Sequence, residues 1–165
     1  MPVVFSVASV DDLGQINDIY NHYISHTAIT FDLEPWSMTK RKQWFESLVQ
    51  TTCYQLFVAT DIGHIIGFAY NGQYRPKLAY QHSTEVTVYT APNNQVKGIG
   101  RQLYQLLLNY LNDHGFHRAY ALITLPNVAS IKLHQHYNFD QVGLMTEVGF
   151  KFEQYHDVAL LELKL

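Results

Sequence analysis

The sequence predicts one mixed α/β domain over residues 1–165, and three observations support this fold class. At 165 residues the chain has the length of one domain, which would bury about 70% of the surface that the unfolded chain exposes. Strand-like and helix-like runs alternate along the chain. No internal repeat, linker or low-complexity tract divides it.

The centre of the predicted fold is a strand, a glycine-containing loop and a helix in direct succession. The run Ser83 to Thr90 is rich in β-branched residues with alternating character, which indicates a strand. A turn signal, Ala91 to Asn94, follows it, and the helix-like run Arg101 to Asp113 begins after two glycines. One face of this helix carries Ile99, Leu103, Leu106, Leu107, Tyr110 and Leu111.

The chain before this centre is predicted to form a strand, two helices and a hairpin. Val3 to Ala8 has the pattern of a short strand, and Ser9 with Asp12 resembles a capping pair that opens a helix. Ser37 caps a second helix that runs to about Val49. The buried side of the first helix carries Leu13, Ile16, Tyr20, Tyr23 and Ile24. The hairpin consists of Cys53 to Thr60 and Ile65 to Tyr74, turned at Asp61-Ile62-Gly63.

Between the two helices, Thr27 to Pro35 is a polar and aromatic stretch with neither helical nor strand periodicity. It is a candidate site loop, and a plain connector is the alternative. Beyond the central helix, the pattern predicts a strand over Arg118 to Leu125, a helix over Asn127 to Tyr137 and a final pair of strands over Asp140 to Leu165. Within that pair, Val158 to Leu161 is apolar on both faces, as in a strand covered on both sides.

Composition excludes several classes of function. The formal net charge is only −3 and no basic cluster stands out, so a nucleic-acid partner has no electrostatic support. Met1 to Ala8 lacks the features of a signal peptide and no apolar run approaches membrane-spanning length, so we expect no membrane partner and a cytoplasmic location. The single cysteine, Cys53, is interpreted as a small core residue. His22 and His26 are spaced i, i+4, but no third ligand follows, and we expect no metal.

The loop before the central helix suits a phosphate. Glycines let a backbone approach a ligand closely, and the unpaired N–H groups and dipole of a helix N-terminus attract an anion. Gly100 is followed by Arg101 and Gln102 rather than Lys and Ser or Thr, which excludes the P-loop pattern. Leu103 stands where a dinucleotide fingerprint requires its third glycine, and no acid follows at the required distance. A nicotinamide cofactor is therefore disfavoured.

What remains is the pattern Gln/Arg-x-x-Gly-x-Gly/Ala, matched by Gln95, Gly98 and Gly100. It resembles the acetyl-CoA pyrophosphate loop of the GNAT acetyltransferase superfamily. Four further segments occur in the order and spacing of the phosphinothricin acetyltransferase-like branch, and together they cover nearly the whole chain. They are Ile29 to Pro35, Glu85 to Tyr89, Asn127 to His134 and Tyr155 to Val158.

The resemblance implies a central mixed, mostly antiparallel sheet flanked by about four helices, and N-acetyl transfer from acetyl-CoA. Proteins of this branch acetylate the α-amino group of phosphinothricin, methionine sulfoximine or methionine sulfone. They are typically homodimers with the sites close to the subunit interface, and we expect a homodimer here. The resemblance further implies that acetyl-CoA contacts Val88, Tyr89, Thr90, Gln95, Val96, Lys97, Gly98, Ile99, Gly100, Arg101, Asn127 and Ser130.

Acetylation of an amine also needs a group that takes its proton, because a protonated amine is not a nucleophile. Glu85 is an acid in the middle of the central strand; it is either buried and functional or on a solvated face of the sheet, and the resemblance favours the catalytic role. His134 is either a helix-surface histidine or, as the resemblance implies, a general base or proton relay.

Substrate selection is assigned to an anion clamp and an aromatic cover. Arg75 and Lys77 flank Pro76 before the central strand, and Tyr80 follows; two cations beside an aromatic side chain can hold a compact anionic head group, and a solvated basic turn is the alternative. The branch often has Lys first and Arg second, the reverse of the order here. Phe31 is similar to an aromatic residue that closes over the substrate in the family.

The function predicted is an acetyl-CoA-dependent N-acetyltransferase of a small amino-acid analogue, acting by direct attack in a ternary complex. Two alternatives remain at this point. One is a peptide or protein N-acetyltransferase on the same fold. The other is a non-catalytic acyl-CoA-binding sensor, and the presence of both Glu85 and His134 argues against it.

Overall fold

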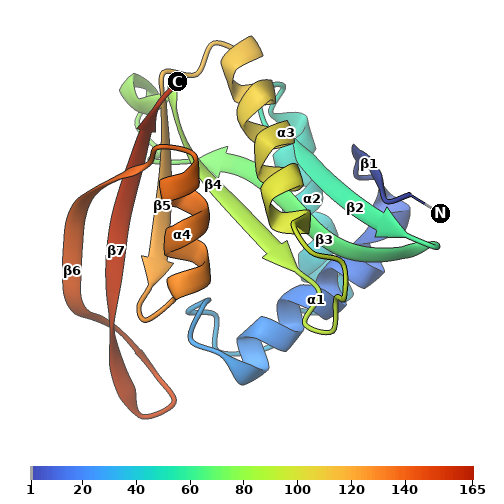
Figure 1. The fold of residues 1–165 in the computed structure, drawn as a ribbon, viewed down its shortest axis with the longest axis horizontal. Helices are drawn as coiled ribbons and strands as arrows, with labels where there is room; N and C mark the ends of the chain where they lie inside the picture. Colours follow the sequence, from blue (N-terminus) through green and yellow to red (C-terminus); the bar gives the residue numbers. More distant parts are fainter. Residues whose placement is uncertain (1) are drawn as a thin grey trace.

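A single twisted sheet runs through the computed structural model, which describes residues 2–165 (Figure 1). Over these residues the sheet has seven strands in the order β1-β2-β3-β4-β5-β7-β6. The strands are β1 (Val4–Val7), β2 (Leu56–Asp61), β3 (His64–Gln73), β4 (Ser83–Thr90), β5 (Arg118–Thr124), β6 (Asp140–Lys151) and β7 (Gln154–Lys164). The helices are α1 (Leu13–His26), α2 (Met38–Gln50), α3 (Ile99–Asp113) and α4 (Val128–His136), with short 3-10 turns at η1 (Val10–Asp12) and η2 (Leu78–Tyr80).

The helix starts follow the capping signals in the sequence. The backbone N–H of Ser9 donates to the Asp12 carboxylate at 2.7 Å in a capping box just before α1. The Ser37 hydroxyl accepts from the Lys40 N–H at 3.2 Å, which opens α2. The Asn127 amide oxygen accepts from the Ser130 N–H at 3.1 Å, so Asn127 is the N-cap of α4.

The β2–β3 hairpin turns where the sequence predicts. Ile62 and Gly63 have φ values of 46° and 79°, so two successive residues adopt the left-handed conformation that a tight hairpin turn requires. Asn138, with φ 61°, tolerates the same conformation directly after α4.

The helices cover both faces of the sheet. α3 packs on one face in the larger apolar cluster, against β2, β3, β4 and β5, and the partly buried Ile131 and Leu133 of α4 join this cluster. α1 and α2 pack on the other face, against β2 and β3. Gly67 on β3 allows α3 to lie very close, because a Cβ there would stand 3.0 Å from both Leu103 Cδ1 and the Tyr89 carbonyl oxygen. The N-terminus of α3 is thereby held near the end of β4.

Within residues 2–165, β4 and β5 are the one pair of neighbouring strands that run parallel. Their pairing is also the shortest in the sheet. Only Ser83, Thr84 and Glu85 pair with β5, opposite Arg118 to Tyr120. β4 stays paired with β3 as far as Thr90, and β5 stays paired with β7 as far as Thr124. Past Glu85 the two strands therefore separate and open a wedge in the middle of the sheet (Figure 1).

β7, which contains the apolar stretch Val158 to Leu161, lies between β5 and β6. Val158, Ala159 and Leu161 are buried. β6 is an edge strand, and its pairing with β7 shifts register between Gln141 and Gly143 and again between Met145 and Gly149. The Asp157 carboxylate supports this irregularity by accepting the Glu147 N–H at 2.7 Å.

Cys53 is half-buried just before β2 and packs against the larger apolar cluster. None of the helices described within residues 2–165 is long and apolar enough to cross a membrane.

Candidate active site

The wedge between β4 and β5 opens into a cavity of about 1130 Å³. Its walls include the separating parts of both strands, residues 85–90 and 121–124. The start of α3 and most of α4 line one side, while Tyr20, Tyr23 and residues 29–31 line the other. Met145, Val148, Val158 and Leu160 from the β6–β7 pair complete the lining. The residues that line the cavity thus come from both faces of the sheet.

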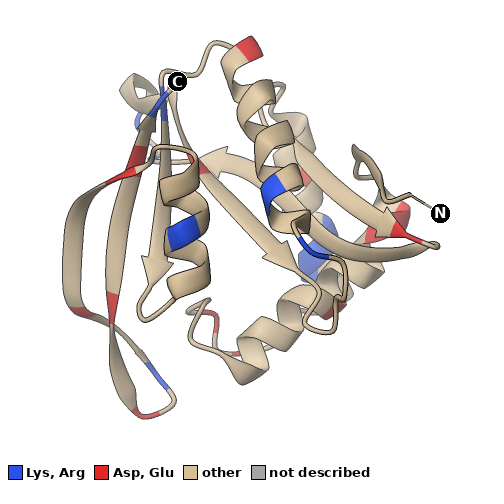
Figure 2. Cartoon of the chain, in the orientation of Figure 1, with Lys and Arg blue, Asp and Glu red and all other residues tan. Residues whose placement is uncertain are grey.

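On the α3 side, the cavity meets a helix N-terminus. Gly98 is the N-cap of α3, with φ 81°, and the first helical hydrogen bond runs from the Gln102 N–H to the Gly98 carbonyl at 3.1 Å. The amide N–H groups before Gln102 have no partner within the helix and are available to an anion. Gly98 and Gly100 line the cavity, and so do two basic residues, Arg101 and Lys132. Figure 2 shows basic positions at the start of α3 and on α4.

This donor set suits the phosphates of acetyl-CoA. Gly100 lines the cavity without a side chain, and a Cβ there would lie 3.7 Å from Thr90 Cγ2, so the backbone of the helix start is open to a ligand beside the strand. Thr90, Asn127 and Ser130 line the cavity as well. The site therefore combines backbone donors, two cations and hydroxyl groups, which is the chemistry that a pyrophosphate needs.

The opposite side of the wedge is a polar and aromatic chamber, which we call the acceptor side. Strand alternation directs Glu85, Thr87 and Tyr89 toward the face covered by α1 and α2. Tyr70 on β3 lies opposite Thr87 and faces the same way. Tyr20 of α1 packs edge-on against Tyr89, with 5.4 Å between the ring centroids.

Glu85 sits where the wedge begins. Its carboxylate is half-buried and lines the cavity, so it is not on a fully solvated face of the sheet. Burial raises the pKa of Glu85, while the Arg75 guanidinium lowers it in part. A carboxylate with a raised pKa is a stronger base than a solvated one, which suits removal of a proton from an amine.

His134 lies on the cavity wall at the α4 side and is buried, with 3% of its surface exposed. Its Nδ1 is 2.7 Å from the Ser130 carbonyl oxygen. Since a carbonyl only accepts, Nδ1 carries the proton, and Nε2 accepts from the Tyr104 hydroxyl at 2.7 Å. Burial lowers the pKa of His134, so the ring is held neutral with both nitrogens engaged within the protein.

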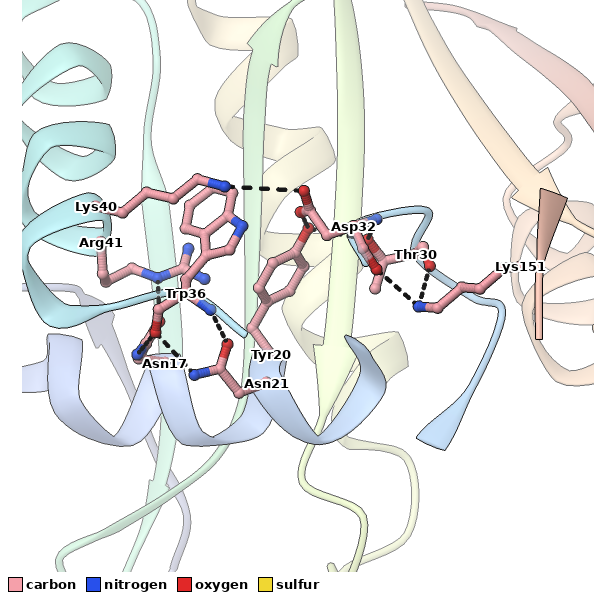
Figure 3. A network of polar contacts seen from close by, with 9 residues as sticks. All are labelled: Asn17, Tyr20, Asn21, Thr30, Asp32, Trp36, Lys40, Arg41 and Lys151. Atoms are coloured by element: carbon pink, nitrogen blue, oxygen red, sulfur yellow. Dashed lines mark hydrogen bonds and ion pairs between the residues drawn. The ribbon is translucent and has the colours of Figure 1, made fainter. Parts of the chain in front are cut away.

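A network behind the acceptor side holds its wall in place (Figure 3). The Tyr20 hydroxyl donates to the Asp32 carboxylate, and burial together with this contact raises the pKa of Tyr20. Arg41 is 2% exposed; its Nε donates to the Asn17 amide oxygen at 3.1 Å, and its guanidinium lies 4.2 Å from the centre of the Trp36 ring. Tyr20 and Trp44 also flank this guanidinium, each 4.7 Å away.

The structure brings most of the predicted site residues to the cavity. Glu85, His134, Phe31 and Arg75 line it, as do Val88, Tyr89, Thr90, Gly98, Gly100, Arg101, Asn127 and Ser130. Two of the predicted substrate residues lie outside its lining: Lys77 and Tyr80 are exposed beside η2. Four of the predicted cofactor residues lie outside it as well; Ile99 is buried in the core, and the other three are Gln95, Val96 and Lys97.

Sequence reasoning did not single out Tyr20, Tyr70, Thr87 or Lys132 as site residues, yet all four line the cavity. Tyr70 and Thr87 could have been found from strand alternation, because they share a sheet face with Glu85. Tyr20 was predicted only as a core residue of α1. His22 and His26 stack with 4.5 Å between ring centroids, and His26 Nδ1 bonds the His22 carbonyl oxygen.

A cleft between two separating strands, with phosphate donors on one side and a half-buried carboxylate on the other, suits an enzyme that brings a phosphate-bearing donor to a second substrate. Comparisons with known proteins identify its family. The family model of the acetyltransferase (GNAT) domain matches residues 6–160. The phosphinothricin N-acetyltransferase of Streptomyces coelicolor is 45% identical over 157 residues, which are 94% of this chain and 92% of that protein.

Solved structures agree. A GNAT superfamily phosphinothricin acetyltransferase from Sinorhizobium meliloti, in complex with acetyl-CoA, superposes with a TM-score of 0.95 at 30% identity, covering 100% of this chain and 89% of that one. A ribosomal-protein-alanine N-acetyltransferase from Brucella melitensis gives a TM-score of 0.95 at 30% identity, covering 98% and 99%. The chain belongs to the GNAT acetyltransferase family, and it is an acetyl-CoA-dependent N-acetyltransferase. The predicted fold and branch are confirmed.

Proposed function

We propose that the protein acetylates the α-amino group of a compact amino-acid analogue of the phosphinothricin, methionine sulfoximine or methionine sulfone type. One observation carries the proposal: Glu85 and the N-terminus of α3 line the same cavity from its two sides. An amine beside Glu85 would reach a thioester held in the wedge by direct attack. The 45% identity to a phosphinothricin N-acetyltransferase supports the choice of substrate class.

In this proposal the residues of the chain divide the work between the two sides of the wedge. Acetyl-CoA supplies an activated acetyl group. The N-terminus of α3, with Arg101, holds its phosphates, and the backbone of residues 88–90 faces the wedge where β4 has lost its β5 partner. Gln95, Val96, Lys97 and Ile99 belong to the same loop and helix start, and we assign them a role in shaping its backbone.

Glu85 acts as the general base. Its partial burial raises its pKa, and its place where the wedge opens lets it accept a proton from an amine on the acceptor side, directly or through one water. For His134 on the opposite wall we keep the predicted role of general base or proton relay, which requires one of its two internal hydrogen bonds to exchange for a contact with a substrate. Its Nε2 is the nitrogen that can take up a proton, and in this structure it accepts from the buried Tyr104 hydroxyl.

Arg75 is assigned to the substrate's anionic head. It lines the cavity beside Glu85, and it lies over the Tyr74 ring, 5.1 Å from its centroid. Lys77 and Tyr80 remain predicted contacts from the neighbouring exposed turn. Phe31 is assigned to cover the substrate, since its side chain lines the acceptor side.

We also propose that the protein is a homodimer. The β6–β7 pair carries exposed apolar side chains that a second copy would cover, and exposed apolar side chains at the edge of a sheet are an aggregation hazard when uncovered. They are Val142, Leu144, Val148, Phe150 and Tyr155. Val148 also lines the cavity, so the interface would adjoin the site. The cytoplasmic location stays a prediction.

Peptide acetylation is the second candidate, and the similarity to the ribosomal-protein-alanine N-acetyltransferase favours it. The decisive experiment measures thiol release from acetyl-CoA with phosphinothricin, methionine sulfone, peptides with a free N-terminus and lysine peptides. The proposal predicts the highest kcat/KM for the first two. Turnover of peptides but not of the amino acids would transfer the assignment to the second candidate. Acetyl-CoA binding with no turnover of any amine would support the sensor.

A further inference from the structure

The segment Thr27 to Pro35, which we call the acceptor loop, is tied to the β6–β7 hairpin through one buried cation. Lys151 is the last residue of β6 and is 4% exposed. Its Nζ donates to the carbonyl oxygens of Thr30 and Asp32, both at 2.8 Å (Figure 3). These two carbonyls belong to the residues on either side of Phe31. A single ammonium group therefore holds the backbone on both sides of Phe31, which lines the acceptor side.

The Phe31 ring packs against Gly149 of the β6–β7 hairpin, which has no side chain. A Cβ built on Gly149 would overlap the Phe31 ring, so only glycine leaves room for the ring there. Gly149 pairs with His156 across the hairpin, and the His156 ring lies 6.2 Å from Phe31. Gly149 does not require glycine for backbone reasons, since its φ lies outside the left-handed region. Its place is explained by the ring above it.

The other end of this contact network reaches the walls of the cavity. The Asp32 carboxylate accepts from the Tyr20 hydroxyl and lies 3.9 Å from Lys40 Nζ. The Tyr20 hydroxyl is also 3.0 Å from the Thr30 hydroxyl oxygen. The acceptor loop is thus anchored to α1 and α2 on one side and to the hairpin on the other. Phe31 stands between the two anchors.

Burying an ammonium group is costly unless it is fully hydrogen-bonded, so a lysine at this position needs a reason. Within residues 2–165, no carboxylate lies within ion-pair distance of Lys151. Its partners are carbonyls of a loop that has no helix or strand of its own, and a short loop without such a tie would be mobile. The buried Lys151 ammonium group therefore serves to order the loop around Phe31.

We propose that Lys151 is a positioning residue for the amine substrate, and that Lys151 and Gly149 together hold Phe31 as a fixed cover over that substrate. The inference rests on the proposed function, because it takes the acceptor side as the amine site. Lys151 itself does not line the cavity. It acts through the acceptor loop.

The first test compares Lys151→Met, Lys151→Arg and Gly149→Ala in steady-state assays with methionine sulfone. Lys151→Met and Gly149→Ala should each raise KM for the amine by about tenfold or more, because a misplaced cover loses substrate contacts. KM for acetyl-CoA should stay within about twofold, since the α3 side is untouched. Lys151→Arg should retain part of the function. Unchanged amine KM in both folded variants would overturn the proposal.

A double-mutant cycle separates positioning from a general loss of structure. In a Phe31→Ala background, Gly149→Ala meets no ring, so it should change the amine KM by less than about twofold. Lys151→Met should likewise lose most of its effect there. If either substitution raises KM as much without Phe31 as with it, the cover is not its route of action. Should Lys151→Met fail to fold, the Gly149 and Phe31 cycle still decides.

A second measurement does not depend on the substrate. Hydrogen exchange in the intact protein should become faster in peptides that cover residues 27–35 of Lys151→Met, while peptides of α3 keep their protection. Identical exchange in the acceptor loop would overturn the anchoring. If the wild-type protein acetylates no amino acid, the proposed function fails, and this measurement still reports on Lys151 alone.

Discussion

Gly100→Ala should separate the stability of the protein from its affinity for acetyl-CoA. Gly100 is the second residue of α3, and its φ lies outside the left-handed region. A Cβ there would be 3.7 Å from Thr90 Cγ2 and 3.9 Å from Leu133 Cδ2, which are ordinary contact distances. The fold itself therefore accepts alanine. The methyl group would nevertheless stand in the gap where we expect the pyrophosphate to approach the helix.

The two effects have opposite signs. Replacing a compatible glycine by alanine stabilises a protein by about 0.4–1 kcal/mol through the unfolded chain. For a chain of this size that raises the melting temperature by about 1–4 °C. Loss of one charge-assisted hydrogen bond to a phosphate costs about 1.5–3 kcal/mol, which weakens binding roughly tenfold to a hundredfold. Gly100→Val should abolish binding outright.

Gly14→Ala is the matched control, because Gly14 is the second residue of α1 and a Cβ there meets nothing within 4 Å. Calorimetry and thermal unfolding of both variants decide the matter. Gly14→Ala should gain similar stability and bind acetyl-CoA as the wild type does. Wild-type affinity in a well-folded Gly100→Ala variant would refute the assignment of this loop to the pyrophosphate. A large loss of stability would refute the packing argument.

Three further predictions concern the acceptor side, the α4 wall and assembly. Arg75→Ala should raise the amine KM about tenfold to a hundredfold. Because the Arg75 charge lowers the pKa of Glu85, the same change should move the acidic limb of the kcat/KM profile to higher pH, and an unmoved limb would show that Arg75 does not influence the catalytic base. His134→Phe should destabilise the fold by about 1–3 kcal/mol, because the buried Tyr104 hydroxyl loses its acceptor. It should also lower kcat, and a pH profile identical to that of the wild type would show that His134 takes no part in proton transfer. Light scattering should give a dimer that Phe150→Lys dissociates, and a wild-type monomer at micromolar concentration would contradict the interface.

The elements of the fold were largely predictable because their signals are local. Ser83 to Thr90 carries a strand pattern that the structure reproduces with the same bounds. The capping residues Ser37 and Asn127 act within four residues of their own position, so the sequence alone contains their partners. The hairpin turn at Asp61-Ile62-Gly63 is likewise a local signal.

The shape of the site was not predictable in the same way, because it depends on contacts between distant segments. The separation of β4 from β5 after Glu85 is a property of strand register, which no pattern within β4 encodes. Lys151 and Thr30 are 121 residues apart in the chain. The bond between Tyr104 and His134 likewise depends on how α4 packs against α3. Resemblance to a family supplied Glu85 and His134, but it did not supply these partners.

The pH dependence of Glu85→Gln tests the central claim most directly. Glutamine keeps the size of the side chain but cannot accept the proton, so kcat/KM for methionine sulfone at neutral pH should fall roughly 10²-fold or more. The defect should shrink as the pH rises, because the amine then loses its proton to the solvent. The affinity for acetyl-CoA should not change. A defect of the same size at every pH would contradict the assignment of Glu85 as the base and would make it a substrate-placing residue instead.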